Sequence, residues 1–189
     1  MKSQIPKTAI KVFEGVVFEV WQWEQEQFDG SFKTFEMLSR TDSVTMIVTV
    51  AGEKILLLDE EQPGRAPFIT LPAGELEKDE LPLIGAMREL IEETGYTSDD
   101  WEEWYQSGIG SRIAYTNHFY IARNAQKTVE QHLDNGGEKI TVREIDFEQF
   151  IALKDEQHFR NKDLLHILEK AAGNKEFKEN LRQKIFNSV

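Results

Sequence analysis

Three glutamates stand close together near the middle of the chain, at a spacing that can serve chemistry. Glu89, Glu92 and Glu93 lie within residues 82–94, where apolar residues recur with a helical period. At about 100° per residue, the three carboxylates fall on the side opposite the apolar stripe. Two explanations fit such a helix: a solvated acidic face, or an oxygen-rich set of ligands for a divalent cation.

The positions of these carboxylates carry small electrostatic costs that a bound cation would remove. Glu89 and Glu93 are like charges at i, i+4, which costs about 0.2–0.5 kcal/mol. Glu92 and Glu93 also lie near the helix C-terminus, where negative charge opposes the helix dipole. No Lys or Arg stands four residues after any of the three. Judged from the helix alone, a metal site and an ordinary acidic surface cluster are therefore about equally good interpretations.

The two ends of this helix are marked in the sequence. Pro82 suits the first helical turn, where its missing N–H costs little, and Gly95 suits a C-terminal stop. The pattern predicts a helix over residues 82–94. Its core-facing stripe is expected to hold Leu83, Ile84, Met87, Leu90 and Ile91.

Glycines and charged residues around the helix extend the three glutamates into one motif. The pattern is G-x5-E-x7-R-E-L-x-E-E-x-G, formed by Gly74, Glu80, Arg88, Glu89, Glu92, Glu93 and Gly95. It resembles the Nudix box at every glycine and every charged position. Tyr96 follows the motif, where the Nudix family generally has an aliphatic residue.

The resemblance to the Nudix box implies a site for Mg²⁺ or Mn²⁺. In Nudix enzymes the box glutamates hold the metal, so Glu89, Glu92 and Glu93 are the expected ligands. The backbone carbonyl of Ala73 is expected to add another. Glu92 and Glu93 are also expected to be catalytic.

Other box residues are expected to support the site. By the same resemblance, Glu80 and Arg88 form an ion pair that holds the loop against the helix. Gly74 is expected to permit a tight turn where that loop begins.

A metal held by carboxylates suits the hydrolysis of a pyrophosphate. The reaction develops charge on phosphate oxygens, so catalysis is largely positioning and charge neutralisation. Mg²⁺ typically takes a few carboxylates together with substrate phosphates and water, and it can acidify the attacking water. The resemblance therefore implies a metal-dependent pyrophosphohydrolase.

The residues in and around the box resemble those of the ADP-ribose/sugar-nucleotide pyrophosphatase branch of the family. The likeness is close over residues 71–96 and looser over 35–170. It implies cleavage of ADP-ribose or a related nucleoside diphosphate sugar to a nucleoside monophosphate and a sugar phosphate. Two alternatives stay open: a Nudix hydrolase of dinucleoside polyphosphates or nucleoside triphosphates, and a non-catalytic nucleotide-sensing module. All box glutamates are present, which favours catalysis over sensing.

Two arginines outside the box are expected to meet the substrate. Arg65 matches an arginine that follows a strand in that branch, displaced here by Pro63 and Gly64. Arg112 lies in a Gly-containing segment, residues 108–114, where the branch has a proline that this chain lacks. The corresponding loop often lines the site in relatives.

The catalytic base is expected on a loop before the last strand. Glu138 is the best positional match in the branch, and Glu130 and Glu144 are alternatives. Gly136 and Gly137 make the loop deformable, which suits closure over a substrate. The alternative, that Glu138 is an ordinary exposed acidic residue of a loop, fits the sequence nearly as well.

The amino-acid composition indicates which classes of binding partner are compatible with the chain. The chain has 189 residues, 34 acidic and 22 basic side chains, and a formal net charge of −12. Such a surface repels nucleic acid and anionic lipid, so we expect a small-molecule partner. There is no cysteine, no apolar run like a secretory signal and no run like a membrane span. These observations favour a cytoplasmic protein.

The remaining sequence predicts the elements that position the box. Strand-like runs occupy residues 12–23, 31–40, 44–50, 54–58, 68–72, 101–107, 117–122 and 139–145, and helical patterning follows from 147 with a break at 171–174. This order predicts an α+β fold, a Nudix-like α/β/α sandwich with a mixed sheet, an N-terminal β-strand extension and C-terminal helices. Residues 1–40 are expected to form the extension and residues 41–189 the catalytic domain. In the branch that the chain resembles, such an extension mediates dimerisation, which implies a homodimer.

Overall fold

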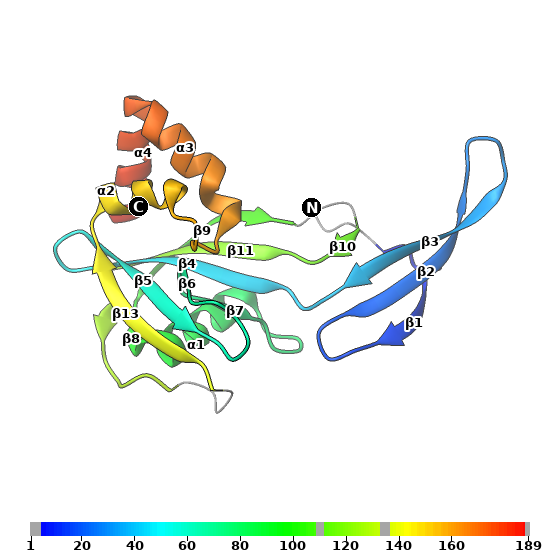
Figure 1. Ribbon diagram of the computed structural model, residues 1–189, viewed down its shortest axis with the longest axis horizontal. Helices are drawn as coiled ribbons and strands as arrows, with labels where there is room; N and C mark the ends of the chain where they lie inside the picture. The colour runs from blue at the N-terminus through cyan, green and yellow to red at the C-terminus, as the bar shows by residue number, and fades with distance from the viewer. Residues whose placement is uncertain (1–4, 109–111, 133–136, 188–189) are drawn as a thin grey trace.

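A mixed sheet with helices on both faces forms the body of the protein, and a second sheet of N-terminal strands projects from it (Figure 1). The computed structural model describes residues 5–108, 112–132 and 137–187. The α+β sandwich with a mixed sheet, predicted from the sequence, is confirmed.

The central sheet has the strand order β13-β5-β4-β11-β9. Its one parallel pair along this order joins β4 to β11, and the other neighbours run antiparallel. The strands of the path are β4 (Ser43–Val50), β5 (Lys54–Glu61), β9 (Asp100–Ser107), β11 (Asn117–Arg123) and β13 (Lys139–Ile145).

Strands β4 and β5 pair only next to their connecting turn, at Thr49 with Ile55 and Val50 with Lys54. Farther on they separate. Two short strands pair with them there, β6 (Phe68–Thr70) with β5 and β7 (Ala73–Glu75) with β4. The segment that enters the helix is thereby attached to two strands of the central sheet.

Alternation along β4 divides the core into two halves. Val44, Met46 and Val48 are fully buried and belong to the cluster that packs against α1 (Pro82–Thr94). Ile47 points to the other face and belongs to the cluster of the C-terminal helices. Successive strand residues face opposite sides of a sheet, so this strand serves both halves of the sandwich.

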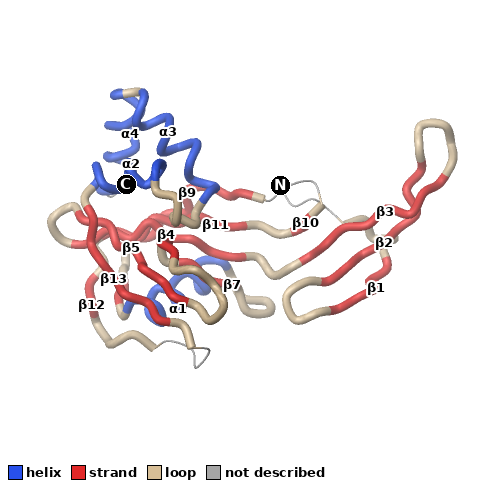
Figure 2. The backbone as a smooth tube through the Cα atoms, in the orientation of Figure 1, coloured by secondary structure: helices blue, strands red, loops and turns tan. Residues whose placement is uncertain are grey.

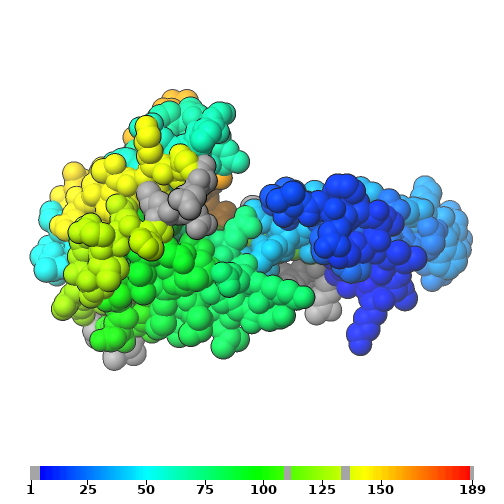
Figure 3. Space-filling view, turned by 90° about the horizontal axis from the view of Figure 1, so that it is seen from below, coloured from blue at the N-terminus to red at the C-terminus, as the bar shows by residue number. Residues whose placement is uncertain are grey.

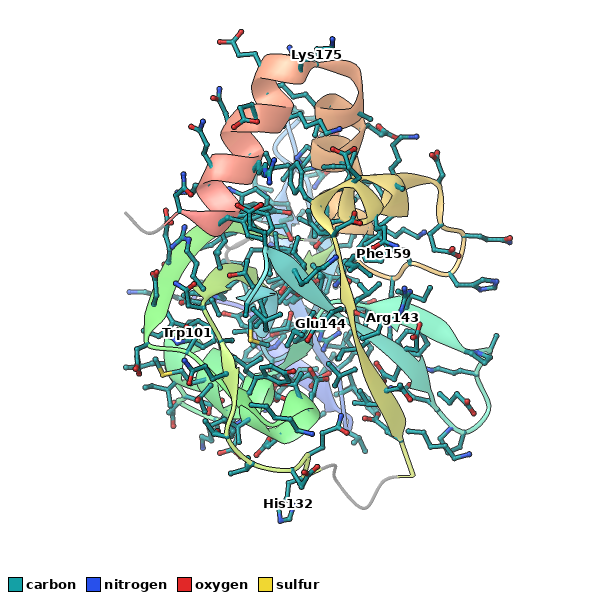
Figure 4. All side chains as sticks on the ribbon, turned by 90° about the vertical axis from the view of Figure 1, so that its left-hand side faces the viewer. Trp101, His132, Arg143, Glu144, Phe159 and Lys175 are labelled. Carbon is teal, nitrogen blue, oxygen red and sulfur yellow. The ribbon has the colours of Figure 1, made fainter. Side chains whose placement is uncertain are left out.

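Three helices cover the face opposite α1: α2 (Phe147–Ala152), α3 (Leu165–Gly173) and α4 (Lys175–Phe186) (Figures 1 and 4). Single-turn 3₁₀ helices precede α3 and follow α2, at Lys162–Leu164 and Leu153–Asp155. The break expected at residues 171–174 lies between α3 and α4. Asn174 caps α4 by accepting a hydrogen bond from the N–H of Phe177.

The N-terminal sheet contains β1 (Ile10–Glu14), β2 (Glu19–Glu26), β3 (Phe32–Ser39) and the short β10 (Ile113–Ala114), in that order. Figure 3 shows these strands lying to one side of the body. The single strand expected over residues 12–23 is wrong, because the chain turns between β1 and β2. The N–H of Gly15 donates to the carbonyl of Phe18 across this turn.

Other expected elements differ from the structure mainly in extent. β5 continues to Glu61, three residues beyond the strand expected over 54–58. Between the strands expected over 117–122 and 139–145 lies a further short strand, β12 (Gln126–Lys127), which pairs with β8 (Tyr96–Thr97). Residues 109–111 and 133–136, including Gly136, lie outside the described residues. None of the helices in the described part of the chain has the length and apolar character needed to cross a membrane.

Candidate active site

Helix α1 begins and ends where the sequence predicted. Pro82 occupies its first turn, and Gly95 ends it with φ of 75°, donating its N–H to the carbonyl of Ile91 at 2.8 Å. The expected buried stripe is partly wrong: Ile84 is exposed, and small residues make the closest contacts. A Cβ on Gly85 would lie 2.3 Å from Cδ2 of Leu76, so the loop before the helix packs directly onto it.

Arg88 connects this loop to the helix. Its Nε and Nη2 donate to the two carboxylate oxygens of Glu80, each at 3.0 Å, and Nη2 also donates to the carbonyl of Glu75. Its Nη1 donates to Glu89 at 2.8 Å and to Glu92 at 2.9 Å. The Arg88 hydrogen bonds hold the pKa of Glu80 below its usual value. The structure thus contains the ion pair expected between Glu80 and Arg88.

The acidic face of α1 is largely covered rather than solvated. The side chain of Glu89 is 15% exposed, and that of Glu92, at 44%, is the open one. Glu93 accepts a hydrogen bond on Oε2 from the N–H of Ala73 at 2.9 Å. Strand β7 runs beside α1 and covers this side of it (Figure 2).

Gly74 lies against the carboxylate of Glu89. A Cβ at position 74 would lie 1.9 Å from Cδ of Glu89 and 2.2 Å from its Oε1. Its φ is not in the left-handed region, since Gly74 pairs with Val44 as part of β7. The tight turn expected at Gly74 is therefore wrong; the position needs glycine because of this close approach.

Burial raises the pKa of both covered carboxyls. Desolvation raises the pKa of Glu89 to about 7, against the opposing effect of Arg88. It raises the pKa of Glu93 well above its usual value, although the Ala73 N–H favours the charged form. Two buried carboxylates side by side are unfavourable without a cation.

These two carboxylates form one wall of a cavity of about 680 Å³. Ala73 and Gly74 line it beside them, and Glu92 does not. The lining also includes side chains from β5, from the segment before β13 and from the segment between α2 and α3. Its lining includes Arg40, Glu60, Gln62, Glu75, Tyr115, Asn117, Glu138, Arg160, Asn161, Lys162 and Asp163.

The residues on this wall fit a divalent cation. Mg²⁺ binds oxygen ligands and keeps several positions for water and substrate phosphates. Glu89, Glu93 and the carbonyl of Ala73 supply oxygens, and the missing side chain of Gly74 leaves room for the Glu89 carboxylate. Within the described residues no three acidic or histidine side chains gather into a ready-made metal cluster. A metal here would therefore depend on the main chain, water and substrate for its remaining ligands.

Of the three glutamates considered as base, Glu138 is the one that lines the cavity. Gln62 Nε2 donates to Oε1 of Glu138 at 2.8 Å and to Oε1 of Glu60 at 2.6 Å. Glu60 is 6% exposed, and burial raises its pKa. Glu130 instead pairs with Lys127. Glu144, labelled on β13 in Figure 4, lines a separate hollow beside Tyr96.

The two expected substrate arginines lie outside this cavity. Arg65 lines a neighbouring shallow hollow, together with Arg160 and Lys162, which also line the cavity itself. The guanidinium of Arg112 stacks on the ring of Phe35 in β3, 4.8 Å from its centroid. The structure thus brings neither side chain to the box carboxylates.

Sequence reasoning missed Arg40, which reaches the cavity from the end of β3. Its guanidinium lies 5.3 Å from the centroid of the Tyr115 ring and pairs with Glu75. Its Nε is buried and has no hydrogen-bond partner among the described residues. Arg40 is brought to the cavity by tertiary contacts, among them its ion pair with Glu75 of β7. A local sequence motif therefore could not have identified it.

Comparisons with known proteins agree with this geometry. The family model described as NUDIX domain matches residues 39–167. The chain is 30% identical to ADP-ribose pyrophosphatase of Bacillus subtilis (strain 168) over 160 residues, which cover 81% of this chain and 85% of that protein. It is also 30% identical to methanol dehydrogenase activator of Bacillus methanolicus over 123 residues, 62% of this chain and 64% of that protein.

The fold is likewise similar to that of a solved structure described as the crystal structure of ADP compounds hydrolase. The TM-score is 0.72, over 93% of this chain and 95% of that one. Sequence identity is 16%, so this likeness concerns the fold alone.

Proposed function

Because the chain belongs to the NUDIX family, whose members with an intact box are pyrophosphohydrolases, we propose that it cleaves the diphosphate of ADP-ribose or a related nucleoside diphosphate sugar, with Mg²⁺ or Mn²⁺. The products are a nucleoside monophosphate and a sugar phosphate. The observation that carries the proposal is the wall of Glu89, Glu93 and Ala73 in the cavity.

Glu89 and Glu93, with the Ala73 carbonyl, are the proposed metal ligands. A bound Mg²⁺ would neutralise phosphate charge and acidify the attacking water. Arg88 keeps Glu89 aimed at the cavity, and the Ala73 N–H does the same for Glu93. Glu92, predicted as a ligand, contributes in this proposal through its hydrogen bond with Arg88.

Glu138 is the proposed base. Its carboxylate lines the cavity and accepts a hydrogen bond from Gln62, which holds it in place. There it can take a proton from water as the bond to phosphorus forms. The buried Glu60 accepts from the same amide group and fixes the orientation of Gln62.

The substrate is proposed from the relatives. The Bacillus subtilis relative is named for ADP-ribose and matches over 85% of its length. Arg40 and Tyr115, which lie against each other in the cavity lining, suit the nucleoside half of such a molecule, because both side chains can stack on a base. Dinucleoside polyphosphates and nucleoside triphosphates are the alternative substrates.

A substrate panel tests this assignment. Purified protein with Mg²⁺ would be incubated with ADP-ribose, sugar nucleotides, NADH, dinucleoside polyphosphates and nucleoside triphosphates, and products identified by chromatography. Highest kcat/KM on a nucleoside diphosphate sugar supports the proposal. A higher value on a triphosphate or polyphosphate refutes the substrate assignment but not the reaction.

A second candidate is a nucleotide-binding module that acts on another protein, as the name of the Bacillus methanolicus relative suggests for that relative. Tight binding of a panel member with no turnover would favour it. The intact box glutamates support catalysis instead.

The N-terminal sheet is proposed to mediate a homodimer. It exposes large apolar side chains, among them Ile10, Phe13 and Phe32, each about 60% exposed or more. Exposed apolar clusters of this kind mark interaction surfaces. The division at residue 40 and a cytoplasmic location also stay predictions. Light scattering of the full chain, beside a Phe13→Ser/Phe32→Ser variant, tests the dimer.

A further inference from the structure

Two cations, Arg160 and Lys162, line the cavity from the segment between α2 and α3. Arg40, the other cation in its lining, pairs with Glu75. Within the described residues, no ion pair joins Arg160 or Lys162 to a carboxylate. Both side chains are exposed, so their donors are open to a ligand.

Arg160 is held in a way that leaves its donors free. Its guanidinium stacks on the ring of Phe68, 4.5 Å from the centroid. Stacking uses the flat face of the group, whereas hydrogen bonds leave from its edge. The backbone N–H of Arg160 also donates to the carbonyl of Ile69 at 2.8 Å. The contact with Phe68 therefore positions the Arg160 side chain, while the N–H groups of its guanidinium stay available to bind an anion.

Asn161, between the two cations, fixes them relative to the metal wall. Its Oδ1 accepts from the N–H of Leu71 at 2.8 Å and from Oγ1 of Thr70 at 3.1 Å. Leu71 is two residues before Ala73, whose N–H bonds Glu93. The segment that carries the two cations is thus hydrogen-bonded to the stretch of chain that leads to Ala73, and it lines the same cavity as Glu89 and Glu93.

A bound diphosphate carries more negative charge than one metal ion can contact. A metal on the carboxylate wall cannot face every phosphate oxygen, and the chain carries a net charge of −12 that repels the rest. Free Arg and Lys donors are the groups that proteins use to bind phosphate. We propose that Arg160 and Lys162 bind a phosphate group of the substrate in the cavity that Glu89 and Glu93 also line.

This inference rests on the proposed function and is tested by a split between KM and kcat. The double variant Arg160→Gln/Lys162→Gln should raise KM for ADP-ribose by roughly tenfold or more while kcat stays within about twofold. Arg160→Lys should keep most of the affinity. The matched control is Lys170→Gln, which removes one cation stacked on a ring, that of Phe177, outside the cavity.

A second substrate identifies which phosphate is bound. If KM rises for ADP-ribose itself, the cations hold the diphosphate. If it rises only for ADP-ribose with an added phosphate on its terminal ribose, they hold that outer phosphate. Unchanged KM for both, or a fall in kcat at constant KM, overturns the proposal.

The affinity for inorganic pyrophosphate, measured by calorimetry in the presence of Mg²⁺, tests the anion site without requiring turnover. Absence of turnover in the wild type would refute the proposed function alone. Weaker pyrophosphate binding by the double variant than by Lys170→Gln would then still support the anion site. Equal binding by the two variants, or no binding by the wild type, overturns it. Thermal melting of each variant checks that it is folded.

Discussion

The main-chain N–H of Ala73 donates a hydrogen bond to Oε2 of Glu93 at 2.9 Å. This contact joins β7 to the last turn of α1 and leaves the Ala73 carbonyl and the second oxygen of Glu93 for other partners. It also places a charged acceptor where burial raises the pKa of the Glu93 carboxyl. A buried carboxylate with a single hydrogen bond is costly without a further partner, which is consistent with the proposed role of Glu93 as a metal ligand.

Glu93→Gln should abolish most activity without unfolding the protein. The amide oxygen can still accept from the Ala73 N–H, and a buried charge is removed. We therefore expect kcat/KM to fall by about a hundredfold or more, while the melting temperature of the metal-free protein is unchanged or higher. Steady-state kinetics and thermal melting measure the two effects.

Glu92→Gln is the matched comparison for Glu93→Gln. Its carboxylate is 44% exposed, bonds Arg88 and does not line the cavity. The sequence predicted that both residues bind metal, whereas this geometry predicts a clearly smaller loss at Glu92. Equal losses in the two variants would show that Glu92 moves into the metal site.

Gly74→Ala should inactivate the enzyme through Glu89. The added Cβ would lie 1.9 Å from the Glu89 carboxyl carbon, so that carboxylate must leave its position. We expect a loss in kcat/KM of about a hundredfold or more and weaker Mg²⁺ binding. Gly173→Ala, where a Cβ meets nothing within 4 Å, is the control and should be neutral. Normal Mg²⁺ affinity in Gly74→Ala would contradict this role.

Stability of the metal-free protein should fall with rising pH. The pKa of Glu89 is raised from 4.5 to about 7 by burial. A raised pKa means that the folded protein holds the proton more tightly, so this stabilisation is complete below the unfolded pKa and is lost as pH rises through the folded one. Mg²⁺ should restore stability most at high pH, because it binds the deprotonated carboxylates.

Thermal melts in EDTA and in Mg²⁺, from about pH 5 to about pH 8, measure this linkage. The melting-temperature difference between the two should increase with pH, and it should be smaller in Glu89→Gln. A melting-temperature difference that stays constant across this pH range would refute the predicted linkage between Mg²⁺ binding and deprotonation.

The sequence predicted best what local chemistry decides. Helix α1 begins at Pro82 and ends before Gly95 as expected, because both residues act on their own backbone. The strand over residues 12–23 was wrong, since the chain bends at Val16 and Val17 within an apolar run. Hydrophobic residues on both sides of that turn hid it.

The site was predictable only where it is continuous in the sequence. Glu89, Glu93 and Gly74 belong to one motif, whereas Arg40 and Arg160 reach the cavity from β3 and from the segment before α3. Their approach depends on strand pairing and on the bond of Asn161 to Leu71. Arg65 and Arg112 were expected by position, but Arg65 lines the adjoining hollow and Arg112 lies over the ring of Phe35.

Glu138→Gln should lower kcat by more than about tenfold while Mg²⁺ affinity is retained. The amide cannot take a proton from water, but it can keep the contact with Gln62. Glu130→Gln, which affects a carboxylate paired with Lys127, should leave kcat unchanged. Kinetics and Mg²⁺ titrations measure both variants. Near-normal turnover of Glu138→Gln would remove this residue from the mechanism.

Arg123→Met should destabilise the fold while leaving the site intact. Arg123 is 1% exposed and donates to Asp100, Glu102 and the carbonyls of Lys184 and Ile185 at the end of α4. Its removal breaks four hydrogen bonds of a buried guanidinium, including those to the two carbonyls at the end of α4, which should cost about 2–4 kcal/mol in the free energy of unfolding. Arg182→Met, which removes a surface pair with Glu53, should cost less than about 0.5 kcal/mol. Urea unfolding compares the two, and equal costs would mean that Arg123 does not hold α4 in place.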